Sequence, residues 1–131
     1  MYSVDIAAAA LESDAFRRVL HTTGHLQLVV MTLAPGEDIG AEVHEHNDQL
    51  LTLVEGLVLA ELGGARQEVG PGEIVVVPAG TEHNFTNVGL VPARLYTVYG
   101  PPDHAPGTVH ETRAEAEAAE AAGTDQPPPE A

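Results

Sequence analysis

Two stretches of the sequence, residues 36–56 and 72–87, constrain the fold most, because each combines turn-forming residues with metal-binding side-chain types at fixed spacing. The first stretch contains, in order, Gly36, Glu42, His44, Gln49 and Gly56. The second contains Gly72, Pro78, Gly80, His83 and Asn87. Glycine, proline and asparagine at such positions favour tight turns between short strands. Each stretch therefore predicts a β-hairpin, and we interpret the glycines, Pro78 and Asn87 as turn-forming residues.

The region around these stretches is divided by glycine into short runs rich in valine and leucine. The predicted strands cover residues 26–33, 41–46, 49–54, 57–62, 66–69, 74–77, 84–88 and 93–99. Gly63-Gly64 and Pro71-Gly72 are further turn signals between them. Many short strands at regular spacing, without a strong amphipathic helix among them, predict an all-β barrel or sandwich.

The two stretches resemble the cupin superfamily, whose motifs read G-x5-H-x-H-x3,4-E-x6-G and G-x5-P-x-G-x2-H-x3-N. Every spacing is met, but Glu42 stands where the first histidine is usual, and Gln49 stands where the glutamate is usual. The resemblance covers about residues 26–100 and implies a double-stranded β-helix, also called a jelly-roll barrel. Within the superfamily, the chain is similar to small single-domain (type-2) cupins labelled phosphomannose isomerase-like.

The resemblance implies a metal site formed by Glu42, His44, Gln49 and His83. Glu42 and His44 are two residues apart, so a strand would direct both side chains to the same face. Two imidazoles, one carboxylate and one amide leave a divalent ion with a net site charge of about +1 when both histidines are neutral. Two oxygen and two nitrogen donors favour Mn²⁺ or Fe²⁺, with Zn²⁺, Ni²⁺ and Co²⁺ as alternatives.

A competing interpretation pairs His44 with His46 as the two histidines of the first motif. This register leaves two residues before Gln49 and three after Gly40, and neither spacing fits the motif. We therefore favour Glu42 with His44, and we treat His46 as an alternative ligand or as an outer-shell partner of the site.

Composition excludes several classes of partner. The formal net charge is -15, and the five basic residues are all arginines. Such a chain cannot neutralise a row of phosphates, so neither nucleic acid nor an anionic membrane is an expected partner. The absence of cysteine excludes disulfides and zinc-thiolate sites. We find no signal peptide or membrane-spanning run, and we expect a cytoplasmic protein.

The predicted barrel, residues 26–100, is flanked by three other segments. Residues 1–25 are expected to form an N-terminal arm or edge strand. Residues 101–113 follow the barrel, and residues 103–110 among them are expected to fold back over its mouth. Residues 114–131 form an acidic tail rich in alanine, glutamate and proline, with a frayed helix over 114–122 and disorder after it. The resemblance implies a homodimer, to which the N-terminal segment would supply an exchanged edge strand.

The resemblance implies a metal more firmly than a reaction, because one fold supports many functions. One hypothesis is a metal-dependent isomerase or dioxygenase acting on a small diol, enediol or hydroxycarbonyl. The alternative is a non-enzymatic protein that binds or senses a small ligand. The absence of lysine disfavours a phosphosugar substrate. His104 and His110 are either general bases or exposed loop residues, and Tyr96 and Tyr99 are candidates for lining the cavity.

Overall fold

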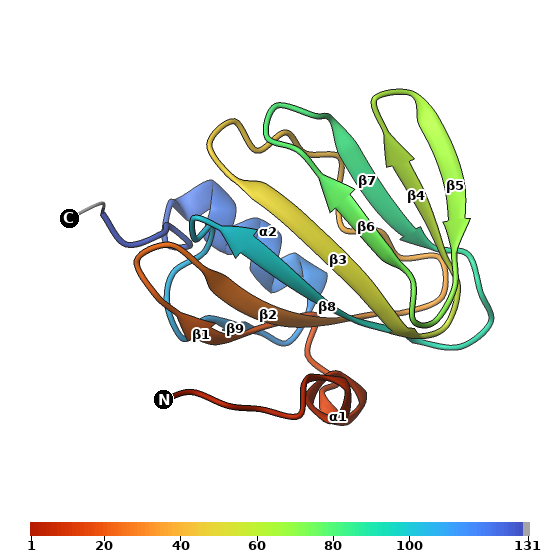
Figure 1. The fold of residues 1–131 in the computed structure, drawn as a ribbon, viewed down its shortest axis with the longest axis horizontal. Coiled ribbons are helices and arrows are strands. Elements are labelled where there is room, and N and C mark those ends of the chain that lie inside the picture. The colour runs from red at the N-terminus through yellow and green to blue at the C-terminus, as the bar shows by residue number, and fades with distance from the viewer. Residues whose placement is uncertain (130–131) are drawn as a thin grey trace.

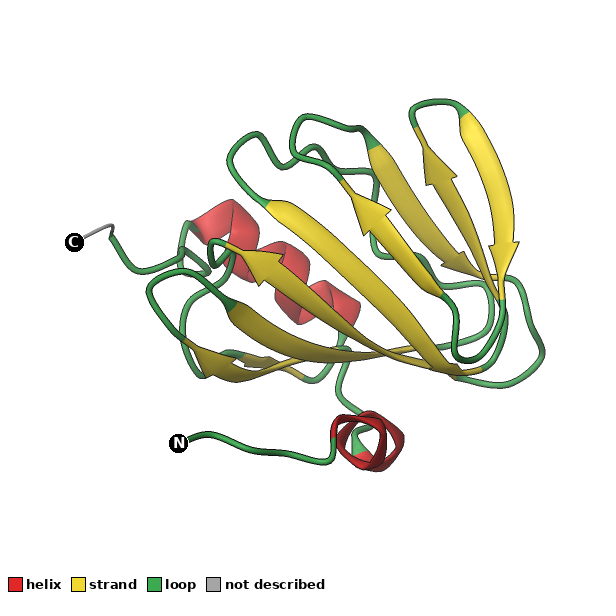
Figure 2. Ribbon diagram, viewed as in Figure 1, coloured by secondary structure: helices red, strands yellow, loops and turns green. Residues whose placement is uncertain are grey.

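Nine strands form two sheets in the computed structural model, which describes residues 1–129 (Figures 1 and 2). The six-stranded sheet has the order β6-β3-β8-β2-β1-β9. Its strands are β1 (Arg17–Thr22), β2 (Gln27–Leu33), β3 (Asp48–Glu55), β6 (Ile74–Val77), β8 (Ala93–Gly100) and β9 (Val109–His110). The three-stranded sheet has the order β5-β4-β7 and consists of β4 (Val58–Leu62), β5 (Ala65–Val69) and β7 (His83–Asn87). The predicted all-β architecture is confirmed.

The core lies between the two sheets and becomes polar toward one end. Strand β8 shows the change, because its buried and half-buried positions alternate and its inward row runs from Leu95 to Thr97 and Tyr99. Gln49, on the neighbouring strand β3, pairs with Tyr99 and is also buried. Apolar side chains fill the rest of the interior, with Met31, Leu33, Leu51, Leu53, Val58 and Phe85 among them. The polar end is where the candidate site forms.

The connection between β2 and β3 differs from the prediction, because residues 41–46 do not form a continuous strand. This segment leaves the six-stranded sheet and runs beside β7 of the other sheet. The β2–β3 connection contacts β7 through two isolated antiparallel bridges, Asp38 with Thr86 and Glu42 with His83, and only the second involves residues 41–46. Gly40, with φ of 101°, interrupts the extended backbone between the two bridges. The bridges nevertheless keep Glu42 in register with β7.

The turn residues of the two stretches have the structural roles that the sequence predicts. Gly36, Gly56, Gly72 and Gly80 all have positive φ, between 82° and 101°. At Gly56, an added Cβ would lie 2.9 Å from the Ala93 Cα, so any other residue would displace the backbone there. The Asn87 amide donates to the Leu33 and Val91 carbonyl oxygens, each at 2.9 Å, and so fixes the end of β7.

Both terminal segments contain elements beyond the barrel. The N-terminal segment, for which an arm or edge strand was expected, forms a short helix, α1 (Ile6–Glu12), followed by β1, which lies between β2 and β9 in the six-stranded sheet. The predicted helix over 114–122 is present as α2 (Arg113–Ala122). The disorder expected after it stays a prediction, and residues 130 and 131 lie outside the described residues. Among residues 1–129, no helix has the length and apolar character needed to cross a membrane.

Candidate metal centre

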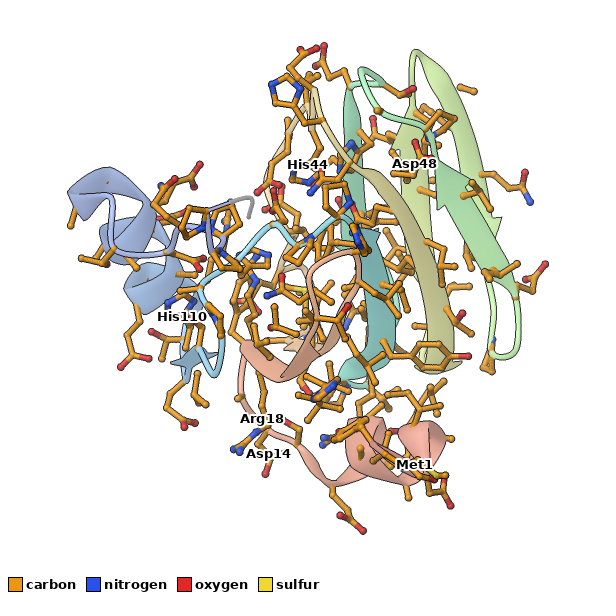
Figure 3. The ribbon with its side chains drawn as sticks, turned by 60° about the vertical axis from the view of Figure 1, so that its left-hand side comes forward. Met1, Asp14, Arg18, His44, Asp48 and His110 are labelled. Atoms are coloured by element: carbon orange, nitrogen blue, oxygen red, sulfur yellow. The ribbon has the colours of Figure 1, made fainter. Side chains whose placement is uncertain are left out.

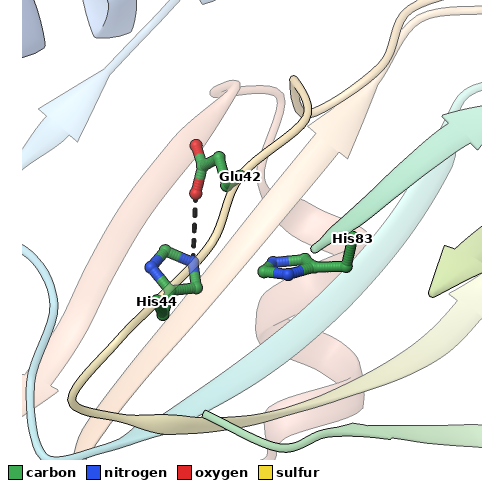
Figure 4. A group of neighbouring side chains, drawn as sticks. All are labelled: Glu42, His44 and His83. Carbon is green, nitrogen blue, oxygen red and sulfur yellow. Dashed lines mark ion pairs between the residues drawn. The ribbon is translucent and has the colours of Figure 1, made fainter. Parts of the chain in front are cut away.

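Backbone pairing brings a carboxylate and an imidazole together. The Glu42 amide donates to the His83 carbonyl oxygen at 3.0 Å, and the His83 amide donates to the Glu42 carbonyl oxygen at 2.9 Å. Residues directly opposite in such an antiparallel pair project their side chains on the same face. As a result, ligand atoms of Glu42, His44 and His83 all lie within 4.8 Å of one another (Figure 4).

His44 completes this cluster. Its carbonyl oxygen accepts a hydrogen bond from the Gly80 amide at 2.8 Å, which ties the β2–β3 connection to the turn before β7. His44 Nε2 lies 3.0 Å from Glu42 Oε2, close enough for an ion pair, yet the angles do not fit a hydrogen bond and the buried Nε2 has no hydrogen-bond partner within residues 1–129. Two ligand atoms that bind one ion at about 2.1 Å and at right angles lie about 3 Å apart. The observed separation fits that arrangement.

Both imidazoles are oriented by a hydrogen-bond acceptor at the opposite ring nitrogen. His83 Nδ1 lies 2.9 Å from the Thr81 carbonyl oxygen, which can only accept, so this nitrogen carries the proton and Nε2 is left with a free lone pair. His44 Nδ1 lies 3.3 Å from Asp103 Oδ1. A carbonyl or carboxylate at the second nitrogen is the usual support for a histidine that binds a metal.

Gln49 presents a free acceptor at the same end of the core. The Thr97 hydroxyl donates to the Leu50 carbonyl oxygen, so its lone pair accepts from Gln49 Nε2 at 2.9 Å. This contact fixes the orientation of the amide and leaves Gln49 Oε1 buried without a hydrogen-bond partner in the described part of the chain. Gln49 Nε2 also contacts the Tyr99 hydroxyl at 3.3 Å, and the Tyr99 ring packs edge-on against His44. A buried polar atom without a partner is costly unless a ligand satisfies it.

Glu42 and His46, the residues that separate the two registers weighed from the sequence, lie in different surroundings. His46 is exposed and lies outside the cluster, whereas Glu42 and His44 lie inside it with His83. His46 lines a neighbouring cavity of about 800 Å³ that also contacts His44. The donor set of Glu42, His44 and His83, with the free oxygen of Gln49 nearby, therefore fits a divalent cation, and His46 is placed at the rim.

Asp103 is a residue of this site that the sequence analysis missed. Burial alone would lower the pKa of His44, but the close, negatively charged carboxylates of Asp103 and Glu42 outweigh it and raise the pKa to about 9. Burial would likewise raise the pKa of Asp103, but its contact with His44 and the charge of His104 hold it at about 2. Without a metal, His44 is therefore protonated at neutral pH, and metal binding must release that proton.

A second series of buried polar contacts runs from Asp125 through His104 to Tyr99, which packs against His44. Asp125, which follows α2, accepts from the Ala105 amide at 2.9 Å and lies 2.7 Å from His104 Nδ1. His104 Nε2 lies 3.5 Å from the Tyr99 hydroxyl. Burial would raise the pKa of Asp125, but the hydrogen bond from His104 and nearby positive charge lower it. His104, which the sequence left as either a general base or an exposed loop residue, is buried.

A cavity of about 540 Å³ opens beside the cluster. Its walls come from β1, the β2–β3 connection, the segment after β8 and the end of α2. They include Arg17, Glu42, His44, Asp103, His104 and Asp125. The volume falls within the usual range for small-molecule sites. Tyr99 lies behind this wall, whereas Tyr96 is half-buried at an outward position of β8.

Comparison with known proteins places the fold in a family. Residues 29–99 match the family model described as the cupin domain. The uncharacterized protein YrkC of Bacillus subtilis is 42% identical over 125 residues, covering 91% of this chain and 67% of that protein. The crystal structure of BH2720 from Bacillus halodurans aligns with a TM-score of 0.88 and 43% identity, over 89% of this chain and 93% of that one. The mannose-1-phosphate guanylyltransferase ManC of Salmonella typhimurium is 28% identical over 72 residues, which cover 55% of this chain and 15% of that protein.

Proposed function

The chain belongs to the cupin family, and from that premise we propose that Glu42, His44, Gln49 and His83 bind one divalent metal ion, at which a small polar molecule binds and reacts. The family match and the structural alignment confirm the double-stranded β-helix fold. The metal and the reaction are our proposal. Two oxygen and two nitrogen donors favour Mn²⁺ or Fe²⁺.

One observation carries the proposal. Two buried atoms, His44 Nε2 and Gln49 Oε1, have no hydrogen-bond partner among residues 1–129, and the first of them lies within 4.8 Å of ligand atoms of Glu42 and His83. A buried acceptor left unsatisfied, such as Gln49 Oε1, costs about 1 to 3 kcal/mol. A cation bound between these side chains would satisfy both atoms and offset the charge of the Glu42 carboxylate.

The residues around the cluster favour proton transfer on a hydroxycarbonyl, that is, an isomerisation. A divalent metal at this position would polarise the carbonyl oxygen of the bound molecule. The reaction also needs a group that takes a proton from one carbon and returns it to the next. His104 is suited to this role, because it lines the cavity and Asp125, 2.7 Å from its Nδ1, orients the ring. Asp103 and the Thr81 carbonyl keep the two ligand imidazoles in position.

Elemental analysis tests the metal site. Protein purified without chelator should contain close to one equivalent of a transition metal, and Glu42→Ala and His83→Ala should each retain less than about a tenth of it, because losing a ligand removes a large part of the binding free energy. His46→Ala is the matched control, since it removes an exposed imidazole two residues from His44. It should keep the full metal content.

Two results would contradict the metal site, and a third would contradict only the reaction. Metal-free wild-type protein, even after incubation with Mn²⁺ or Fe²⁺, would remove the metal site altogether. Loss of metal in His46→Ala with retention in Glu42→Ala would show that His46, and not Glu42, is the ligand beside His44. Full metal content without turnover of any small hydroxycarbonyl would retain the site but favour a ligand-binding protein over an isomerase.

A further inference from the structure

We propose that Arg17 binds the carboxylate group of the ligand, so that the small molecule held beside the metal centre is a hydroxy or oxo acid rather than a neutral polyol. This inference rests on the proposed function and narrows it, because it assigns a chemical class to the occupant of the 540 Å³ cavity. Arg17 suits this role because it is buried, has no carboxylate within ion-pair distance among the described residues, and lines the cavity, although its guanidinium also lies over the Phe16 ring.

Arg17 is a buried cation without a carboxylate partner in the described structure. Its relative exposure is 5%, and its Nε is buried without a hydrogen-bond partner within residues 1–129. In the same residues, no carboxylate oxygen lies within 4.0 Å of its guanidinium, whereas Arg66, Arg94 and Arg113 each have such a partner. Burying an unpaired charge costs several kcal/mol, so a buried guanidinium is expected to have a negative partner.

The strand places this guanidinium at the cavity. Side chains of β1 alternate, so Arg17 and Val19 face inward while Arg18 is exposed and projects outward (Figure 3). An inward position on a core strand would normally hold an apolar residue such as Val19. Arg17 instead lines the same cavity as Glu42 and His44. Its charge also acts on the buried hydroxyl of Tyr99, the neighbour of His44, and this charge opposes the rise that burial causes in the pKa of Tyr99.

The surrounding charges favour a carboxylate over a phosphate. Glu42, Asp103, Glu120 and Asp125 line the cavity together with Arg17, and the sequence contains no lysine. A phosphate dianion would face four carboxylates and a single guanidinium. A carboxylate carries one negative charge and matches the planar fork of donors that arginine presents. The hydroxyl or oxo oxygen of the same molecule would then lie on the side of Glu42 and His44.

Calorimetric titration with a matched pair of probes tests this assignment. Lactate and lactamide have the same size and the same hydroxyl group, but only lactate carries a negative charge. Wild-type protein should bind lactate more tightly than lactamide. In Arg17→Gln, the ratio of the lactate affinity to the lactamide affinity should fall by roughly ten- to one-hundredfold, the range expected for a charge-assisted hydrogen bond. Arg18→Gln is the matched control, because it removes the same charge from the adjacent, exposed position. It should bind both probes as the wild type does.

Further measurements keep the inference separate from the metal proposal. Every titration is repeated on metal-stripped protein, and metal content is measured for each variant. If the wild type holds no metal, the proposed function fails, whereas an Arg17-dependent preference for lactate in the stripped protein would still support the anion site. If Arg17→Gln does not fold, Arg17→Lys replaces it, because that variant keeps the positive charge. It lacks the planar guanidinium that donates two parallel hydrogen bonds, so it should weaken lactate binding severalfold.

Three outcomes would overturn the inference. One is equal binding of lactate by wild type and by a folded Arg17→Gln. Another is equal binding of lactate and lactamide by the wild type. The third is inorganic phosphate displacing lactate at lower concentration than lactate itself requires, which would assign the site to phosphate.

Discussion

A proton on His44 competes with a metal ion for the same nitrogen. Its Nε2 faces Glu42, and its Nδ1 contacts Asp103, so two carboxylates stabilise the imidazolium in the absence of metal. The same carboxylates attract a divalent cation once the proton leaves. Asp103 therefore orients His44 for metal binding and also sets how readily His44 gives up its proton.

Replacing Asp103 should change the titration of His44. In metal-stripped protein, Asp103→Asn should lower the pKa of His44 from about 9 toward its ordinary value of 6.5, because burial then acts with less opposition. The stabilisation that the raised pKa gives the folded wild type is complete below pH 6.5 and is lost as the pH rises through 9. NMR titration of the imidazole measures the pKa, and urea unfolding at both ends of this range measures the loss.

Glu45→Gln is the control for Asp103→Asn, because it removes one negative charge from the exposed residue next to His44. It should leave the titration of His44 close to that of the wild type. An unchanged pKa in Asp103→Asn would show that Asp103 does not support this histidine.

The spacing of the two stretches was enough to predict the residues that meet in the cluster, because a hairpin and a β-bridge bring fixed positions together. Asp103 and Arg17 could not be found this way. Asp103 follows Pro101-Pro102 in a segment without regular pairing, and Arg17 belongs to a strand outside both stretches. The available signal was the position of Arg17 two residues before the apolar Val19. In a strand, these two side chains lie on the same face.

At the level of elements, the predicted bounds of strands and helices agree with the structure where turn signals and capping residues are clear in the sequence. Strands whose apolar runs lie between clear turn signals, such as β6, lie where predicted, even at the edge of the sheet. Residues 41–46 alternate like a strand, but Gly40 leaves them only a single bridge to β7. Helix α2 is better defined than a frayed helix, because Thr112 and Glu115 form a reciprocal capping box that the sequence already contained.

Removing the cap should loosen α2 without changing the barrel. Thr112→Ala eliminates the hydroxyl that accepts from the Glu115 amide at 3.2 Å, at an expected cost of about 1 kcal/mol. Amide hydrogen exchange over residues 115–119 should become about fivefold faster, while exchange in β8 stays the same. Thr112→Ser retains the cap and should behave like the wild type. Faster exchange in both variants, or in neither, would contradict the capping role.

At the scale of the whole molecule, the dominant feature is negative charge. Twenty acidic residues face five arginines, so most carboxylates repel one another across the surface. The ion pairs between Arg66 and Glu61 and between Arg113 and Glu117 are largely exposed and offset little of this repulsion. Screening by salt should therefore favour the compact state.

The melting temperature of metal-stripped protein should rise with salt at neutral pH. Between about 0.05 M and about 0.5 M NaCl, the Debye length falls severalfold, and we expect an increase of at least about 3 °C. Differential scanning calorimetry measures the shift, and sucrose at matched osmolality is the control for general solvent effects. A melting temperature that stays constant or falls with NaCl would show that repulsion does not limit stability.

The C-terminal end of the chain forms part of the wall of the cavity, since Asp125 anchors it to His104 and Pro127 borders both cavities. At the other end of the chain, Tyr2 stacks on His21 of β1, next to Thr22 and Thr23, which line the 800 Å³ cavity, and both ends of the chain lie on the same side of the molecule in Figure 1. A polyhistidine purification tag at either end would therefore bring foreign imidazoles to a protein whose metal content is to be measured. A tag that is cleaved off before the analysis leaves only the protein's own ligands and makes measured metal stoichiometries easier to interpret.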